Sequence, residues 1–103
     1  MRIIATSTLN AYAEKYPSAK ESLRAWKQVC EERSWQSHQE LKAAIPSASI
    51  IKGKRVVFNI AGNSFRLVAD VEYRFQIVYF IWFGPHKDYD KLDVSNLTYK
   101  PPL

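Results

Sequence analysis

The sequence predicts an α+β fold, with helices in the first half of the chain and an antiparallel sheet in the second. In the first half, apolar residues recur every three to four positions, which is the period of a helix with one buried face. From Ile50 onward the period changes to two, which is the period of strands. Helices followed by a run of strands are typical of the α+β class.

The first elements are indicated by a short apolar run and a cluster of hydroxyl side chains. Arg2–Ala5 can begin the sheet. Thr6–Thr8 offer N-caps for a helix, because a hydroxyl oxygen can accept a hydrogen bond from a free N–H group of the first turn. That helix is predicted to reach Tyr16, where Pro17 interrupts it, since proline disfavours the helical conformation in the residue before it.

A second helix is predicted after this proline. Ser18–Glu21 has the pattern of a capping box, in which two side chains satisfy free backbone N–H groups. The apolar residues expected to face the core from this helix are Leu23, Trp26, Val29 and Cys30. Ser34–Ser37 is predicted to connect it to a short helix at His38–Ala44, which Pro46 ends.

The second half is predicted to hold three strands. Arg55–Ile60 and Ser64–Glu72 are joined by the turn signal Gly62-Asn63. Gln76–Phe83 is apolar on both faces, which predicts an inner strand of the sheet. The remaining segments are a turn or short helix at His86–Leu92 and an irregular tail at 95–103, so a single domain is expected over 1–94.

Alternation along the hairpin predicts its register and its faces. A two-residue turn sets Asn59 opposite Arg66 and Phe58 opposite Leu67. The side chains expected on the core face are Val56, Phe58, Ile60, Phe65, Leu67, Ala69 and Val71. Arg66 then stands on the opposite face, and a slip of one residue would bury its charge without a partner.

Composition limits the classes of protein that this chain can be. Its 103 residues are 47% apolar and 24% charged, which suits one ordered domain. The single cysteine, Cys30, excludes an internal disulfide and is expected to fill the core. We expect no metal and no cofactor, because metal-ligand spacings and a glycine-rich phosphate loop are absent from the sequence. The N-terminal segment lacks a signal peptide pattern and Ile77–Phe83 is too short to span a bilayer, so a cytoplasmic location without membrane contact is expected.

Positive charge is concentrated in the half that carries the strands. The chain has 15 Lys and Arg against ten Asp and Glu, for a net charge of +5. Residues 41–103 hold nine basic and five acidic residues, and residues 1–40 hold six and five. Aromatic residues alternate with these bases, which favours RNA binding through phosphates and stacked bases. The candidate RNA-binding residues are Lys54, Arg55, Asn59, Arg74 and Lys87, whereas His38 is expected to lie on the surface at a helix start.

Arg66 has two interpretations at this stage. It can be a surface arginine that pairs with Asp70 or Asn59, or a rigidly held guanidinium that grips a phosphate through two hydrogen bonds. His86 and Tyr89 also have two. They can cap and anchor the last turn, or they can transfer a proton and hold the substrate.

The order of these motifs resembles HigB-type toxins of type II toxin–antitoxin modules. The match runs over about residues 1–94, and its most specific parts are Phe58-Asn59-Ile60, Gly62-Asn63, Arg66-Leu67 and His86-x-x-Tyr89-Asp90. Pro85 departs from the threonine expected before this histidine. The resemblance implies a RelE-like fold, with two N-terminal helices packed on an antiparallel sheet.

It also implies a ribosome-associated endoribonuclease that cleaves mRNA and is neutralised by a HigA-like helix-turn-helix antitoxin. Attack by the 2′-hydroxyl group needs no metal if side chains stabilise the phosphorane and move the protons. Arg66, His86 and Tyr89 are the candidate catalytic residues on this basis. Two other classes stay open: a non-catalytic RNA-binding or regulatory module, and an interaction domain whose apolar strand pairs with a partner.

Overall fold

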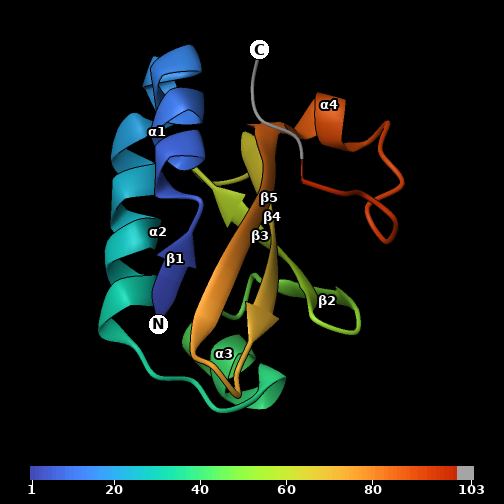
Figure 1. Ribbon diagram of the computed structural model, residues 1–103. Helices are drawn as coiled ribbons and strands as arrows, with labels where there is room; N and C mark the ends of the chain where they lie inside the picture. The colour runs from blue at the N-terminus through green and yellow to red at the C-terminus, as the bar shows by residue number, and fades with distance from the viewer. Residues whose placement is uncertain (100–103) are drawn as a thin grey trace.

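A five-stranded sheet is the frame on which the helices pack (Figure 1). The computed structural model describes residues 1–99, so the last four residues of the predicted tail, 100–103, lie outside the described residues. Along the chain the elements are β1 (Arg2–Ile4), α1 (Thr6–Lys15), a 3₁₀ turn (Pro17–Ala19), α2 (Lys20–Glu32), α3 (His38–Ala44), β2 (Ser49–Lys52), β3 (Arg55–Ile60), β4 (Phe65–Glu72), β5 (Ile77–Pro85) and α4 (His86–Tyr89). This confirms the α+β class.

The strand order is β1-β5-β4-β3-β2. Strands β3, β4 and β5 pair antiparallel as predicted. Strand β2 was not predicted and pairs antiparallel with β3, whereas β1 pairs with β5 in parallel. The sheet is therefore mixed rather than purely antiparallel. The sequence did not predict this, because a three-residue apolar run does not indicate the direction in which its strand pairs with a distant partner. Strand β5 has a neighbour on each side, so the interpretation in which this apolar strand pairs with another protein is wrong.

Helices α1 and α2 cover one face of the sheet and enclose the main core (Figure 1). Aromatic contacts join the two layers: the ring centres of Trp26 and Phe58 lie 5.3 Å apart, as do those of Tyr12 and Phe80. Cys30 is fully buried, as predicted. Val29 was expected in the same stripe but is 38% exposed, because it lies at the edge of the buried face of α2.

The predicted caps of these two helices are wrong. The N-cap residues are Ala5 and Ala19, and neither end has a side-chain cap bond. Thr6 Oγ1 instead donates to the carbonyl of Ile3, at the end of β1. The 3₁₀ turn runs directly into α2, so the Lys20 N–H group already donates to the Pro17 carbonyl and needs no cap from Ser18.

Helix α3 is capped and tethered. Ser37 Oγ accepts a hydrogen bond from the Glu40 N–H group, which satisfies one donor of the first turn. His38 begins the helix as predicted, but both of its ring nitrogens are bonded. Nε2 lies 2.7 Å from the Gly53 carbonyl oxygen and therefore donates, while Nδ1 lies 2.6 Å from the Tyr73 hydroxyl group. These bonds hold α3 against two turns, the one between β2 and β3 and the one between β4 and β5.

The hairpin has the predicted register. Asn59 is opposite Arg66 and Phe58 is opposite Leu67. Every residue assigned to the core face is buried in the main core: Val56, Phe58, Ile60, Phe65, Leu67, Ala69 and Val71. The turn spans 61–64, with φ of 54° at Ala61 and 66° at Gly62, so the glycine occupies a left-handed conformation that favours it.

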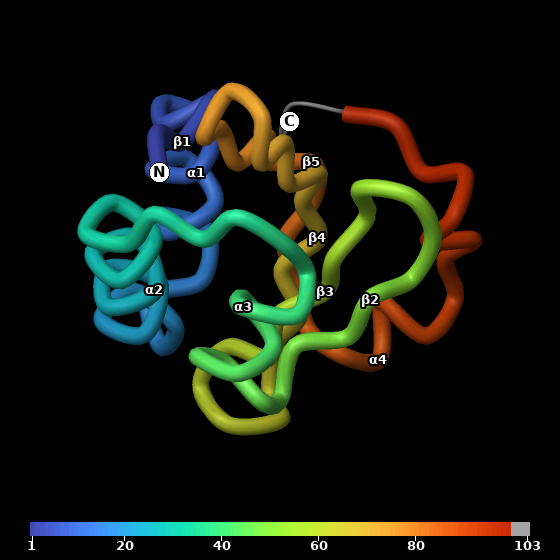
Figure 2. The backbone as a smooth tube through the Cα atoms, turned by 90° about the horizontal axis from the view of Figure 1, so that it is seen from below, coloured from blue at the N-terminus to red at the C-terminus, as the bar shows by residue number. Residues whose placement is uncertain are grey.

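The face of the sheet opposite α1 and α2, called the second face here, is partly covered. Its residues are therefore not all at the protein surface. Val57, Val68 and Ile81 are buried there beneath Trp82, Tyr89, Val94 and Leu97. Seen end-on in Figure 2, the sheet lies between α1 and α2 on one side and the segment after α4 on the other. The fold therefore has a second, smaller core, and the described part of the tail is irregular but packed. No helix within residues 1–99 is long and apolar enough to cross a membrane.

Leu67→Ala tests the face assignment. Leu67 is fully buried between the sheet and the helices, so its truncation should lower the free energy of unfolding by about 2–5 kcal/mol. Val29→Ala removes an exposed side chain and should change it by less than about 0.5 kcal/mol. Urea unfolding of the two variants makes the comparison, and equal midpoints would contradict the assignment.

Tyr73 predicts how stability changes in alkali. Burial raises the pKa of the Tyr73 phenol to about 12. A raised pKa leaves stability intact below the ordinary value near 10 and removes it as the pH rises toward 12, because the unfolded chain loses the proton first. Tyr73→Phe should therefore flatten the loss of stability between pH 10 and pH 12, relative to wild type. Parallel urea midpoints over this range would contradict the prediction.

Candidate active site

Three neighbouring strands, β3, β4 and β5, carry the candidate site at the end of the sheet beside α4. Arg66 on β4 is opposite Asn59 on β3 and Gly84 on β5. Directly opposed residues of antiparallel strands point to the same face, so the three positions form a row across the second face of the sheet. Arg66 is partly buried in this row, with strands on both sides that restrain its backbone.

The Arg66 guanidinium is held by backbone carbonyls. Its Nη1 donates to the carbonyl oxygens of Asn63 and Phe65, at 3.0 and 3.1 Å. Within residues 1–99, Arg66 forms no ion pair, and Asp70 binds another arginine. The interpretation in which Arg66 pairs with Asp70 is therefore wrong, and its other donors are available for an anion.

Trp82 and Tyr89 form an aromatic floor beside Arg66. Their ring centres lie 6.4 Å apart. Trp82 on β5 is opposite Val68 on β4, and its ring lies over Gly84, where a side chain would collide with it. Burial raises the pKa of the Tyr89 phenol and outweighs the positive charge of Arg66, which lowers it. The phenol therefore keeps its proton at neutral pH and can donate a hydrogen bond.

His86 stands at the first position of α4, at the rim of the site. Its backbone N–H group donates to the Ser64 carbonyl, which ties α4 to the β3–β4 turn. The imidazole is 53% exposed, and its Nδ1 lies 3.5 Å from the Asp90 carboxylate. Helix α4 has no side-chain cap bond, so the interpretation in which this imidazole caps the last turn is wrong. Tyr89 does anchor the turn, since it packs on the second core.

The remaining candidates are divided between this site and the rest of the sheet. Asn59 and the exposed Lys87 lie beside Arg66 and His86, and Asn59 Nδ2 is 3.4 Å from Asn63 Oδ1. Lys54 and Arg74 lie at the other end of β3 and β4. The Lys54 ammonium contacts the Glu72 carboxylate, and the Arg74 guanidinium lies 5.4 Å from the centre of the Phe75 ring.

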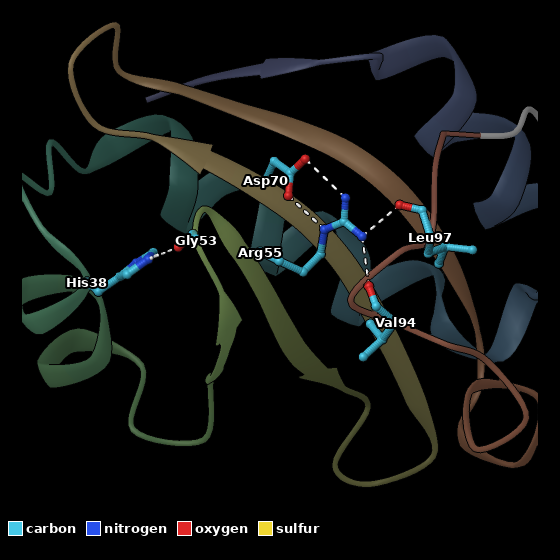
Figure 3. A network of polar contacts seen from close by, with 6 residues as sticks. All are labelled: His38, Gly53, Arg55, Asp70, Val94 and Leu97. Carbon is cyan, nitrogen blue, oxygen red and sulfur yellow. Dashed lines mark hydrogen bonds and ion pairs between the residues drawn. The ribbon is translucent and has the colours of Figure 1, made fainter.

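Arg55 has an internal role (Figure 3). Its guanidinium donates to both carboxylate oxygens of Asp70, at 2.7 and 3.2 Å. The same side chain donates to the carbonyl oxygens of Val94 and Leu97, at 2.7 Å each. Only 12% of the Arg55 side chain is exposed. Arg55 therefore fastens the C-terminal segment to the sheet, and this placement does not support its inclusion among RNA contacts.

Trp82 is the residue of this site that sequence reasoning missed. The pairing of β4 with β5 shifts between Val68 and Ala69, where Ile81 is an extra residue. Because of this bulge, Ile81 and Trp82 both belong to the second face, whereas strict alternation would send one of them to the main core. Gly84 was the available signal, since a glycine inside a strand often marks a close approach.

Comparisons with known proteins agree on one family. Residues 19–92 match the model of the HigB toxin family, described as the RelE-like toxic component of a toxin–antitoxin system. The chain is 36% identical over 92 residues to the mRNA interferase toxin HigB of Escherichia coli K12, covering 87% of this chain and 88% of that protein. It is 27% identical over 94 residues to the mRNA interferase HigB of Escherichia coli O6:H1 (strain CFT073), covering 89% and 91%.

Gly84→Ala tests how closely Trp82 is packed. A Cβ atom at residue 84 would lie 2.7 and 2.8 Å from the Cη2 and Cζ2 atoms of Trp82, so the ring must move away. We expect a loss of about 1–3 kcal/mol in stability, as is usual for overpacking. In a Trp82→Ala background the same change should cost almost nothing. A double-mutant cycle measured by urea unfolding would contradict the packing if the two effects simply add.

Proposed function

This chain belongs to the HigB family of RelE-like toxins of toxin–antitoxin systems, and we propose that it cleaves mRNA at the surface around Arg66. The observation that carries the proposal is a guanidinium on the face away from the main core, without an ion-pair partner in the described residues, next to a protonated phenol. A cation and a hydrogen-bond donor close enough for the charge of one to affect the pKa of the other are suited to hold a phosphodiester group.

In the proposed reaction the RNA supplies its own nucleophile. The 2′-hydroxyl oxygen attacks the adjacent phosphorus atom, the bond from phosphorus to the 5′-oxygen breaks, and the products are a 2′,3′-cyclic phosphate and a 5′-hydroxyl end. Negative charge grows on the non-bridging oxygens in the transition state. Arg66 stabilises that charge, and the Tyr89 hydroxyl group donates a hydrogen bond to the same phosphate.

His86 carries the proton in this scheme. An exposed imidazole can reach either the 2′-hydroxyl group or the leaving 5′-oxygen, and imidazole is suited to proton transfer near neutral pH. The carboxylate of Asp90, 3.5 Å from Nδ1, orients the ring. We propose that this chemistry proceeds without a metal ion, since Arg66 supplies the cation.

The partners follow from the same proposal. Asn59 and Lys87 contact the RNA near the cleaved bond, and Lys54 and Arg74 contact it farther along the sheet. The ribosome presents the mRNA, and a HigA-like helix-turn-helix antitoxin neutralises the toxin. The cytoplasm, where translated mRNA is found, is the place of action. The relatives' names as mRNA interferases and the net charge of +5 support an mRNA substrate, and the family's description as the toxic component of a toxin–antitoxin system supports an antitoxin partner.

The alternative is a non-catalytic RNA-binding module of the same shape. It also predicts affinity for RNA, but it does not need the imidazole of His86 and yields no new RNA ends. Growth arrest alone therefore does not separate the two functions. Mapping of 5′-hydroxyl ends does.

The test is induced expression of wild type, Arg66→Ala and His86→Ala without the antitoxin. Wild type should arrest growth and produce transcripts with new 5′-hydroxyl ends. Arg66→Ala should reduce cleavage by about 10²–10³-fold, which is typical for loss of one transition-state donor. His86→Ala should have a comparable effect if the ring moves a proton. Val29→Ala serves as the matched control, because its side chain is exposed on α2.

Thermal melting of each purified variant separates lost chemistry from lost folding. All four proteins should melt at similar temperatures, since Arg66 and His86 lie outside the main core. Wild-type cleavage by a folded Arg66→Ala variant would overturn the proposed site, and arrest without new ends would favour the non-catalytic module.

A further inference from the structure

The turn between β4 and β5 carries an aromatic ring in solvent, at the end of the sheet away from Arg66. Phe75 is 63% exposed, and the guanidinium carbon of Arg74 lies 5.4 Å from the centre of its ring. A single exposed apolar side chain is common on protein surfaces, so what distinguishes Phe75 is the rigidity of its turn and the charged groups around it. The described contacts of the catalytic site do not include it.

This turn is firmly tied to the rest of the protein. Gln76 Nε2 donates to the carbonyl oxygens of Trp35 and Tyr73, at 2.7 and 2.9 Å. The Gln76 carbonyl accepts from the Arg2 N–H group at 2.8 Å, which joins the turn to β1. Phe75 is therefore presented on a rigid base, and little conformational entropy is lost when a partner binds its ring.

The surroundings of Phe75 are positively charged. Glu72 contacts the Lys54 ammonium and accepts a hydrogen bond from the backbone N–H group of Arg74, so both basic residues lie close to this one carboxylate. Arg2 is exposed where β1 meets the turn. Three cations against one paired carboxylate favour an anionic partner, and an exposed ring with an arginine beside it is the usual platform for a nucleobase.

We propose that this turn, formed by residues 73–76, is a second contact for single-stranded RNA, in which a base stacks on Phe75 and Arg74 binds the adjoining phosphate. The inference rests on the proposed function and extends its substrate path. Arg66 and Glu72 are six positions apart on β4, which corresponds to ~20 Å of strand. The segment after α4 covers the sheet between these two positions, so the RNA must pass over it and needs at least about six stacked nucleotides at 3.4 Å each. The turn therefore contacts the RNA several nucleotides away from the cleaved bond.

The experiment measures fluorescence anisotropy with two oligonucleotides whose 2′-hydroxyl groups are methylated, so that neither can be cleaved. A tetramer can occupy the Arg66 region but cannot reach the turn, whereas a dodecamer can occupy both. Phe75→Ala should weaken dodecamer binding by about 5- to 100-fold, the range expected for one lost stack. It should leave tetramer binding unchanged, and Phe75→Trp should retain dodecamer affinity.

Salt dependence separates the two side chains of the turn. Arg74→Gln should reduce the slope of log affinity against log salt by about 0.7 for the dodecamer, because one phosphate contact is lost. Phe75→Ala should leave that slope unchanged. Val29→Ala, which shortens an exposed apolar side chain elsewhere, should change neither affinity nor slope.

The outcomes distinguish this inference from the proposed function. If Phe75→Ala binds the dodecamer as wild type does, while Arg66→Ala loses cleavage, the second contact is wrong and the active site stands. If Phe75→Ala instead weakens only the complex with an antitoxin, the turn is a protein-binding site and the inference is overturned. If wild type binds neither oligonucleotide, both the contact and direct RNA binding by this surface are wrong.

Discussion

The register of β3 against β4 is the constraint on which the rest of this protein depends. Asn59 opposite Arg66 and Phe58 opposite Leu67 place the phenylalanine, leucine and isoleucine side chains of the hairpin under α1 and α2. A shift by one residue would expose Leu67 and bury a guanidinium, which costs far more than any local contact can return. The burial of the main core therefore decides which face carries Arg66. Stability and the placement of the candidate active site are results of one pairing.

That much could be predicted from the sequence, because the alternation of Arg55–Ile60 and Phe65–Glu72 is regular and the turn between them has a glycine. Strand β5 is different. Ile77–Phe83 is apolar at nearly every position, so it contains no alternation from which a bulge at Ile81 could be inferred. Trp82 was missed for this reason. The parallel pairing of β1 was missed because a three-residue run does not specify its neighbour.

Contacts between distant segments were also beyond sequence reasoning. The carbonyl oxygens of Val94 and Leu97 meet Arg55 across 39 and 42 residues of chain, and no local pattern marks them. Their effect on function is indirect but physical. By holding this segment on the second face, Arg55 closes the small core on which Trp82 and Tyr89 pack. The floor of the candidate site thus rests on an arginine that itself faces no substrate.

Arg55 and Arg66 show that the residue type and the face of the sheet on which it lies do not determine its role. Both stand on the second face of neighbouring strands, and both are arginines in a basic region of the chain. The residue opposite each one differs: Asp70 faces Arg55, and Asn59 faces Arg66. A carboxylate neutralises a guanidinium and uses its paired donors, whereas an amide carries no charge and leaves the cation intact. Of these two cross-strand pairs, the first therefore stabilises the fold, and the second leaves a fixed positive charge, which the proposed reaction uses to hold a phosphate.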